Sequence, residues 1–314
     1  MKQRALVTGG AGFIGSHIQD ALIKKGFEVA VLDNLRSGKR GNLNPKARFY
    51  FCDIRDKEVL DVVFDDFKPH YVFHQAAQNE ARPSMKFPAY DAEVNIVGTI
   101  HILEACRRNR TKKIIYASSG GTVYGEVPPE EMPIPEDYPL TEPASAYGIS
   151  KHTVEHYLKL YERSYGLKWT ALRYPNVYGP RQDGNAEAGV VAIFTTLMFK
   201  KKRPTINGDG TILRDYTFID DIVAANLLAL KKGNNDAFNL GTGEETSVQQ
   251  VFDTLEKYLK TGLKPVYGPP VLGDVSRVLL DTSKAQKLLG WKAKYTFDRG
   301  VKKTIKYYRE FLEK

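Results

Sequence analysis

The sequence predicts an α/β protein built around a doubly wound parallel sheet, with a smaller α/β part toward the C-terminus. In the first half of the 314-residue chain, short runs of β-branched and apolar residues alternate with longer amphipathic stretches. This alternation is typical of strand–helix–strand units, whose parallel strands are covered by helices on both faces. The length and the 42% content of apolar residues allow a sizeable core.

The order of the elements follows from periodicity and from turn residues. A short apolar run bounded by Gly, Pro or Asp predicts a buried strand, and apolar residues three and four positions apart predict a helix. The expected strands are Arg4–Thr8, Glu28–Asp33, Arg48–Asp53, His70–Ala76, Lys112–Ser118 and Trp169–Tyr174. The expected helices between them are Phe13–Lys25, Lys57–Phe67, Val94–Asn109 and Ser150–Tyr165.

The composition changes after Tyr174, where Pro and Gly cluster and strict alternation ends. We therefore expect a sheet domain over residues 1–175 and a smaller, interleaved substrate-binding domain over residues 176–314. A segment near 215–245 is expected to return to the first domain, because Phe238–Gly241 has the character of a strand. The proline- and acid-rich stretch Val127–Pro143 is expected to be a surface loop.

Charge and composition exclude several classes of protein. The formal net charge is +9, but the basic residues are scattered. The densest run, Lys200–Arg203, is interpreted as a solvated helix end, with attraction of a phosphorylated substrate as the weaker alternative. There is no aromatic-and-basic pattern of a nucleic-acid module, and no apolar run approaches the roughly 20 residues of a membrane helix. The two cysteines provide neither a disulfide framework nor a metal site. These features predict a cytoplasmic protein without nucleic-acid, membrane or metal partners.

Three glycines predict a dinucleotide site of the Rossmann type. Gly9, Gly12 and Gly15 follow the first strand and open the first helix, where backbone must approach a pyrophosphate closely. Asp33 ends the second strand about 20 residues further on, where a carboxylate accepts hydrogen bonds from ribose hydroxyls. Because Asp33 would repel a 2′-phosphate, NAD is favoured over NADP, although Arg36 and Lys39 lie nearby.

Other residues expected at the cofactor lie at the ends of later strands. Asp53 either borders the adenine with Ile54 or caps the helix at Lys57. His74 is interpreted as a packed strand histidine, because no partner ligands lie at metal spacing. The full cofactor-binding set is Gly9, Gly12, Phe13, Ile14, Gly15, Asp33, Asn34, Ser37, Gly38, Asp53, Ile54, Gln75, Ala76, Ala77, Gln78, Asn95, Tyr147, Lys151 and Pro175.

Tyr147 and Lys151 are the candidate reacting groups. Residues four positions apart lie on one face of a helix, so the ammonium can lie beside the phenol. A free phenol has a pKa of about 10, and a nearby cation is expected to lower that value. The pair would then take a proton from an alcohol and return it. The alternative is an unrelated surface pair. Ser119 or Thr122, after the fifth strand, could add a hydroxyl, with turn formation as the alternative.

Together these segments resemble the extended short-chain dehydrogenase/reductase family over nearly the whole chain, and within it the UDP-galactose (UDP-glucose) 4-epimerases. The motifs that carry the resemblance are Thr8–His17, Asp33–Leu35, Asn95 with Gly98–Thr99, Val123–Gly125, Tyr147 with Lys151, Arg173–Gln182, Gly189–Phe194, Arg214–Tyr216 and Leu289–Trp291.

The resemblance implies an NAD-dependent isomerase that inverts C4 of a nucleotide sugar, UDP-glucose or UDP-galactose, through a 4-keto intermediate. It implies that Tyr147 exchanges the hydroxyl proton, that Lys151 holds the nicotinamide ribose, and that the chain forms a homodimer. The catalytic set is Tyr147, Lys151 and Ser119. The substrate-binding set is Ser119, Gly120, Thr122, Tyr147, Asn176, Gly189, Val190, Thr205, Asn207, Arg214 and Asp274.

The chain departs from the family pattern at two places. Gly120 replaces a Ser or Thr of many relatives, so Ser119, Thr122 or a water must supply that hydroxyl, and Ser119 is preferred. Val271–Asp274 lacks the usual Arg of this segment, which removes an expected diphosphate contact, with Arg277 as a candidate replacement. Val278 falls near a position where side-chain size affects sugar entry, which keeps UDP-N-acetylhexosamines open as substrates.

Two other functions remain as alternatives. A sugar-nucleotide dehydratase usually has an acidic pair between the fifth strand and the Tyr-Gly, where this chain has Gly120, Gly121 and Thr122. A non-catalytic NAD-sensing protein on the same fold can dispense with the tyrosine and lysine, which are both present here.

Overall fold

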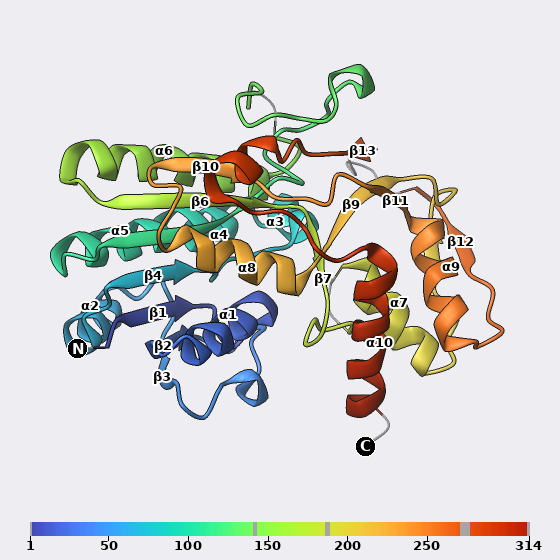
Figure 1. Ribbon diagram of the computed structural model, residues 1–314, viewed down its shortest axis with the longest axis horizontal. Helices are drawn as coiled ribbons and strands as arrows, with labels where there is room; N and C mark the ends of the chain where they lie inside the picture. Colours follow the sequence, from blue (N-terminus) through green and yellow to red (C-terminus); the bar gives the residue numbers. More distant parts are fainter. Residues whose placement is uncertain (1, 141–142, 186–188, 271–276, 313–314) are drawn as a thin grey trace.

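A seven-stranded parallel sheet forms the centre of the larger of two lobes (Figure 1). The computed structural model describes residues 2–140, 143–185, 189–270 and 277–312. The strand order β10-β6-β5-β4-β1-β2-β3 confirms the predicted doubly wound sheet. The strands are β1 Arg4–Thr8, β2 Glu28–Asp33, β3 Arg48–Phe51, β4 Tyr71–His74, β5 Lys113–Ser119, β6 Lys168–Tyr174 and β10 Asp236–Asn239.

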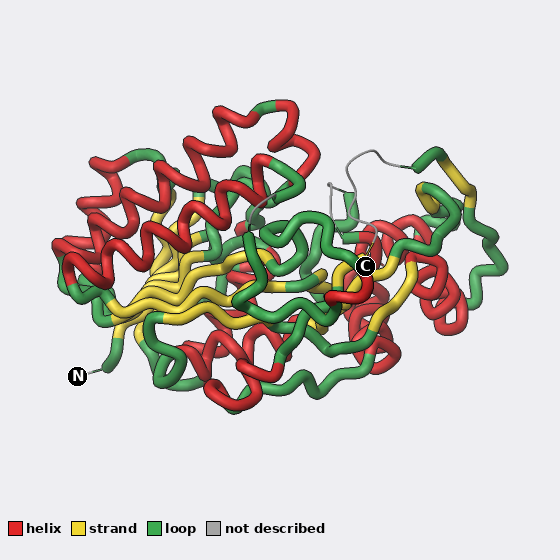
Figure 2. Tube along the Cα trace, turned by 90° about the horizontal axis from the view of Figure 1, so that it is seen from above, coloured by secondary structure: helices red, strands yellow, loops and turns green. Residues whose placement is uncertain are grey.

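Helices cover both faces of this sheet, as the view from above shows (Figure 2). Alternate residues of β1 enter different cores: Ala5 and Val7 belong to one hydrophobic cluster and Leu6 to the other. The first cluster includes side chains of α1 (Phe13–Lys24) and α8 (Ile219–Ala229). The second includes side chains of α2 (Lys57–Phe67), α5 (Gly98–Arg108) and α6 (Ala146–Tyr165). Because both faces are covered, all seven residues of β5 are buried.

The smaller lobe has little regular sheet. In its four-stranded sheet, β9 pairs with β11, β13 and β7, while β8 pairs separately with β12. The described elements here are β7 Asn176–Tyr178, α7 Val190–Phe199, β8 Thr205–Asn207, β9 Leu213–Phe218, β11 Glu245–Ser247, α9 Val248–Leu259, β12 Val266–Gly268, β13 Arg277–Val278 and α10 Phe297–Leu312.

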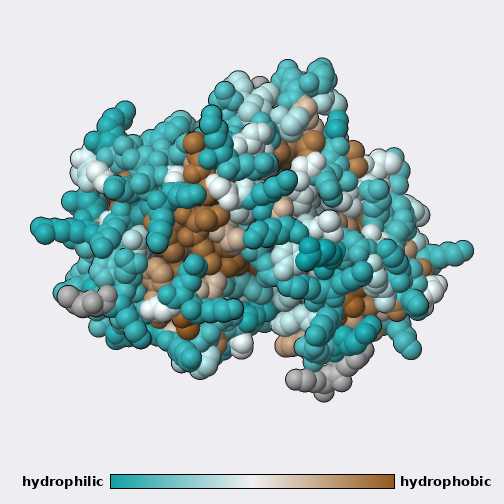
Figure 3. Space-filling view, viewed as in Figure 1, coloured by the Kyte–Doolittle hydropathy of each residue, from teal (hydrophilic) through white to brown (hydrophobic). Residues whose placement is uncertain are grey.

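The face shown in Figure 3 is mostly polar, and its largest apolar area lies over α8. Val223, Leu227 and Leu228 of this helix are only partly buried. No helix within the described ranges has the length and apolar character needed to cross a membrane.

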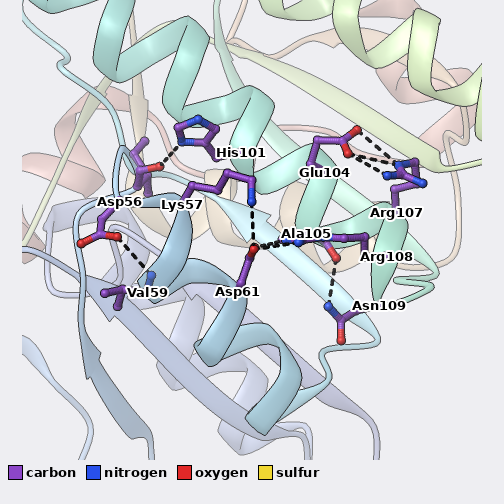
Figure 4. Close-up of polar contacts among 11 residues, drawn as sticks. Asp56, Lys57, Val59, Asp61, His101, Glu104, Ala105, Arg107, Arg108 and Asn109 are labelled. Atoms are coloured by element: carbon purple, nitrogen blue, oxygen red, sulfur yellow. Dashed lines mark hydrogen bonds and ion pairs between the residues drawn. The ribbon is translucent and has the colours of Figure 1, made fainter.

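Helix α2 shows how local chemistry sets an element's start. Asp56 is its N-cap and accepts a hydrogen bond from Val59 N at 3.1 Å (Figure 4). The prediction that Asp53 might cap this helix is therefore wrong. In the same view, Asp61 of α2 forms ion pairs with Lys57 and with Arg108 of α5. These exposed pairs join the two helices but contribute little stability.

Several elements differ from their predicted bounds. Strands β3 and β4 are shorter than expected, and helix α6 begins at Ala146 because Ser145 accepts from Gly148 N at 3.1 Å. The expected helix over 94–109 begins with a π-helical turn, η2 (Glu93–Val97). The stretch 127–143 is not simply a surface loop, since Val127 and Ile134 are buried against Leu280. Short helices not predicted are α3 Ala81–Lys86, α4 Pro88–Ala92, η1 Arg40–Asn42, η3 Pro129–Glu131 and η4 Ala285–Leu289.

Candidate active site

The glycines after β1 form a tight turn at the carboxyl end of the sheet, on the side that faces the smaller lobe (Figure 1). Gly9 has a left-handed φ of +67°, and a Cβ there would lie 2.7 Å from Ala76 N. Gly12 is the N-cap of α1, whose first turn has neither a capping side chain nor an acidic residue. The backbone N–H groups of this turn are therefore suited to an anion such as a pyrophosphate.

Asp33, at the end of β2, lies against this turn. Its Oδ2 accepts from Ala11 N at 2.9 Å and its Oδ1 from Leu35 N at 2.8 Å. A Cβ at Gly38 would lie 2.8 Å from Oδ1, so glycine leaves the carboxylate approachable. Burial raises the pKa of Asp33, and the two backbone hydrogen bonds oppose that rise. Because a carboxylate has about four acceptor sites, Asp33 keeps capacity for ribose hydroxyls.

The two cations near Asp33 in the sequence have other partners. The Arg36 guanidinium carbon lies 4.6 Å from the ring centroid of Tyr90. The Lys39 ammonium forms an ion pair with Asp183 at 2.7 Å. These contacts leave Asp33 as the dominant charge beside the turn, which favours a ribose without a 2′-phosphate.

The loop after β3 contributes Asp53 and Ile54. Asp53 Oδ2 accepts from Asn34 Nδ2 at 2.9 Å and pairs with Arg55 at 2.9 Å. Ile54 is buried beneath Gly98, whose Cβ would lie 2.7 Å from Ile54 Cγ1. Asn34 and Asp53 thus form one polar edge, and Ser37 is exposed in the loop that follows β2.

The loop after β4 closes against the glycine turn and holds an unsatisfied donor. Asn95 is 2% exposed, accepts from Gln78 N and donates to Gln78 O, both at 2.9 Å. Gln75 Oε1 accepts from Tyr174 OH at 3.2 Å, but Gln75 Nε2 is buried without a partner. A buried amide donor without an acceptor is costly. A ligand bound along the loop after β4, near Ala76 and Ala77, could supply that acceptor to Gln75 Nε2. The residues here fit a bound dinucleotide.

His74 is a packed strand histidine, as predicted. It is 1% exposed, its two ring nitrogens bond Thr8 Oγ1 and Thr99 Oγ1, and burial lowers its pKa to about 3. Within the described part of the chain, no three His, Cys, Asp or Glu side chains form a metal site.

Helix α6 brings Tyr147 and Lys151 to the end of β5. The Lys151 ammonium lies 5.6 Å from the Tyr147 ring centroid and 4.9 Å from that of Tyr116. It donates to Ala117 O at 2.8 Å and its residue is only 3% exposed. The two groups therefore share one face of the helix, and Lys151 is not a surface residue.

The electrostatics of this pair differ from the expectation. Burial raises the pKa of Tyr147, and Asp91 adds to the rise while a hydrogen bond with Ser119 opposes it. Burial lowers the pKa of Lys151 to about 8, and Asp91 opposes that change. The expected net lowering of the phenol pKa is therefore wrong for this structure, because the loss of water around the buried phenol oxygen raises that pKa.

A chain of hydroxyls leads to the phenol. Thr122 Oγ1 donates to Ser119 Oγ at 2.9 Å, and Ser119 in turn hydrogen-bonds the Tyr147 side chain. The preferred hydroxyl, Ser119, is therefore in contact with the phenol, and Thr122 sets its orientation.

Gly120 is explained by a residue far along the chain. A Cβ at this position would overlap Leu280 Cδ1, and Leu280 is 1% exposed in the cluster with Val123 and Val278. Leu280 fills the space that a Ser or Thr side chain would need at position 120.

The expected substrate residues lie in several places. Asn176 opens β7 directly after Pro175, and its Oδ1 lies 4.0 Å from the Cβ position of Gly121. Arg214 of β9 lies opposite Val278 of β13, and its Nη1 donates to Leu213 O. Gly189 and Val190 begin α7, while Thr205 and Asn207 are exposed on β8. None of these last four has a described hydrogen bond to the Tyr147 group.

The segment with the missing arginine, Val271–Asp274, lies outside the described residues, and so does Asp274 as a predicted substrate residue. Arg277, its candidate replacement, forms an ion pair with Glu245 and donates from Nη2 to Oε2 at 2.8 Å. In this structure Arg277 is therefore engaged with β11.

Three residues near the reacting centre were not predicted from the sequence. Ser84 Oγ accepts from Tyr147 N at 3.0 Å, Asp91 acts electrostatically on Tyr147 and Lys151, and Leu280 packs on Gly120. All three reach the site through tertiary packing, so no local sequence signal marks them.

The glycine turn, the carboxylate at the end of β2 and the tyrosine beside a buried lysine define a dinucleotide-dependent enzyme of the extended short-chain dehydrogenase/reductase type. The chain belongs to the NAD dependent epimerase/dehydratase family, whose model matches residues 5–241.

Similar proteins cover essentially the whole chain. A putative UDP-glucose 4-epimerase of Methanocaldococcus jannaschii is 46% identical over 97% of this chain and 98% of its own length. A Thermotoga maritima UDP-glucose 4-epimerase, solved with UDP-glucose, is 48% identical with a TM-score of 0.96, covering 99% and 100% of the two chains. A Methanobrevibacter ruminantium UDP-N-acetylglucosamine 4-epimerase, solved with UDP-N-acetylmuramic acid, is 35% identical with a TM-score of 0.92, covering 99% and 100%.

Proposed function

We propose that this protein is an NAD-dependent isomerase that interconverts UDP-glucose and UDP-galactose at C4 of the hexose. The observation that carries the proposal is the contact of the half-buried Tyr147 with Ser119 beside the buried Lys151, in a chain of the NAD-dependent family. The near-identical fold of a 48% identical UDP-glucose 4-epimerase and the 46% sequence identity to a putative UDP-glucose 4-epimerase support the choice of substrate.

Bound NAD supplies a hydride acceptor and donor for C4, so the net reaction is redox-neutral. Tyr147 takes the proton of the C4 hydroxyl and later returns it. Ser119, oriented by Thr122, donates to the reacting oxygens. Lys151, with a pKa of about 8, is mainly an ammonium at neutral pH and stabilises the negative phenolate oxygen. The 4-keto sugar turns over before C4 regains its hydrogen from the other face.

Residues 1–175, with the returning segment near 215–245, would hold NAD, and residues 176–314 would hold the nucleotide sugar. Gly9, Gly12 and Gly15 would bind the pyrophosphate and Asp33 the ribose. Asn176 would contact the sugar and Arg214 the diphosphate, because its planar fork binds pairs of oxygens. Gly189, Val190, Thr205, Asn207 and Asp274 complete the proposed substrate set.

A homodimer through α5 and α6 is part of the proposal. Val97, the last residue of η2 directly before α5, and Ile149, Leu160 and Tyr165 of α6 are each at least 39% exposed. A set of exposed apolar side chains on adjacent helices is suited to a symmetric interface. Light scattering should report twice the chain mass; a monomer would overturn this part. The free, buried cysteines fit a cytoplasmic enzyme.

The test begins with the cofactor. Denaturing the purified protein should release NAD, and the native protein should convert UDP-glucose to UDP-galactose without added reductant. Absence of conversion in the presence of bound NAD would favour the NAD-sensing alternative. UDP-N-acetylglucosamine belongs in the same panel, because a 35% identical neighbour is a UDP-N-acetylglucosamine 4-epimerase. A 4-keto-6-deoxy product would instead indicate a dehydratase.

A further inference from the structure

Asp91 is a buried carboxylate next to the reacting helix. It lies on α4 and is 0% exposed. Its Oδ2 accepts from Ser150 Oγ at 2.6 Å and its Oδ1 from Asn95 Nδ2 at 3.0 Å. Among the described residues, no Lys, Arg or His forms an ion pair with it. A charge buried in this way is costly, so its position calls for a compensating partner.

Lys151 is also buried, carries the opposite charge, and likewise has no ion-pair partner among the described residues. Its ammonium has Ala117 O and the ring of Tyr116 as neighbours, and the described residues provide it with no contacting carboxylate. Within the described ranges, Lys151 is the charged residue that lowers the pKa of Asp91, and Asp91 is the charged residue that raises the pKa of Lys151. Ser150, which binds Asp91, is the residue directly before Lys151 in α6.

We propose that Asp91 is a positioning residue of the reacting centre. Held by Ser150 and Asn95, its carboxylate anchors the first turns of α6 and supplies the buried counter-charge for the Lys151 ammonium. This role rests on the proposed function, because it concerns the same proton transfer at Tyr147.

The other titratable groups around Asp91 and Lys151 do not supply the counter-charge for the Lys151 ammonium. His74, below Lys151 on β4, stays neutral because burial lowers its pKa to about 3. Tyr116 on β5 is kept protonated, since burial raises its pKa well above the ordinary value. Glu155, one turn further along α6, is engaged by Arg173 at 2.7 Å. Burial raises the pKa of Asp91 itself, while Ser150, Lys151 and Asn95 oppose that rise. Tyr147 and Lys151 are the groups of the reacting centre whose pKa values respond to the charge of Asp91.

The charge of Asp91 has a distinct effect on the pH dependence. A negative charge raises the pKa of a neighbouring phenol and of a neighbouring ammonium alike. Removing it lowers both values. Both limbs of the bell-shaped rate profile, which belong to the coupled pair, must then move to lower pH. A residue with a merely structural role would lower the rate and leave both limbs in place.

The experiment compares Asp91→Asn with the wild-type NAD-bound enzyme. We expect both limbs of the kcat profile to shift downward by about one pH unit, the size of a single nearby charge. Asp221→Asn is the matched control. Asp221 is 2% exposed and accepts from Lys294 N and Tyr295 N at 3.0 Å, so its loss affects folding without touching the reacting centre. Unshifted limbs in a folded Asp91→Asn enzyme overturn the proposal.

Two NMR measurements on the wild-type protein keep the proposal testable if the variant does not fold or if the substrate is different. ¹³C-labelled aspartate should show Asp91 ionised at pH 7; a protonated Asp91 overturns the proposal. ¹³C-labelled lysine, assigned with Lys151→Met, should show Lys151 titrating near pH 8, and lower in Asp91→Asn. A protein that passes both tests yet does not epimerise UDP-hexoses refutes the proposed function and leaves the role of Asp91 supported.

Discussion

Glu155 and Lys151 are two buried charged residues on the same helix, α6, and they differ in whether an ion-pair partner is in contact. Arg173 and Glu155 are 4% and 3% exposed and form a closed pair, with Arg173 Nη2 2.7 Å from Glu155 Oε2 and Nε 3.0 Å from Oε1. Ser118 and Tyr124 complete their hydrogen bonds. Four residues before Glu155 on α6, Lys151 is equally buried but has no carboxylate in contact within the described structure.

The contrast separates a structural from a chemical use of charge. A fully paired group fixes β5, β6 and α6 relative to one another and cannot easily change its protonation. An unpaired ammonium beside a phenol remains free to respond when a proton moves. The variants below should therefore affect stability at the first cluster and turnover at the second.

The largest effect is expected from Tyr147→Phe. Removing the group that carries the proton should lower kcat by about 100- to 10,000-fold while NAD stays bound. The rate of UDP-galactose formation and the NAD released on denaturation measure the two parts. Tyr161→Phe, on the same helix but bonded to Glu104, is the control and should keep its rate. Normal turnover by Tyr147→Phe would refute the assigned role.

Breaking the closed pair should act on stability. Arg173→Met leaves the buried Glu155 with the Ser118 hydrogen bond but without its ion-pair partner, and should lower the free energy of unfolding by about 3–5 kcal/mol. Although burial alone would raise it, Arg173 and Ser118 lower the pKa of Glu155. That stabilisation is therefore present above the ordinary pKa of a glutamate and is lost as the pH falls. Urea unfolding at several pH values measures it, with Glu155→Gln/Arg173→Met expected to recover part of the loss.

Gly120→Ser tests whether the Leu280 side chain excludes a serine or threonine from position 120. The added side chain would overlap Leu280, which should cost about 1–3 kcal/mol of stability. In a Leu280→Ala background, adding Gly120→Ser should cost less stability than it does in the wild type, because the smaller side chain makes room. If Gly120→Ser alone is as stable as the wild type, Leu280 does not determine this position.

The smallest effect is expected from Thr122→Val, which keeps the shape and removes one hydrogen bond to Ser119. A loss of about 1 kcal/mol in orienting Ser119 corresponds to roughly a five-fold lower kcat, with unchanged stability and KM. Ser119→Ala should lower kcat further. An unchanged rate in both variants would show that a water supplies the third hydroxyl.

The sheet could be predicted from the sequence because strands buried on both faces are continuous apolar runs. The Gly, Pro and Asp residues that end them are adjacent in the sequence. The turn at Gly9 and the spacing of Tyr147 and Lys151 were visible for the same reason. Asp91, Ser84 and Leu280 were not, since each reaches the site from another element. The pKa of Tyr147 was misjudged because burial, a property of the folded chain, outweighs the neighbouring cation.

The most direct test follows a deuterium atom. UDP-glucose labelled with deuterium at C4 should give UDP-galactose that keeps the label at C4, in ordinary water and without added cofactor or reductant. That result would show that C4 loses and regains the same hydrogen within one active site. Loss of the label to solvent, or inversion at another carbon, would contradict the account.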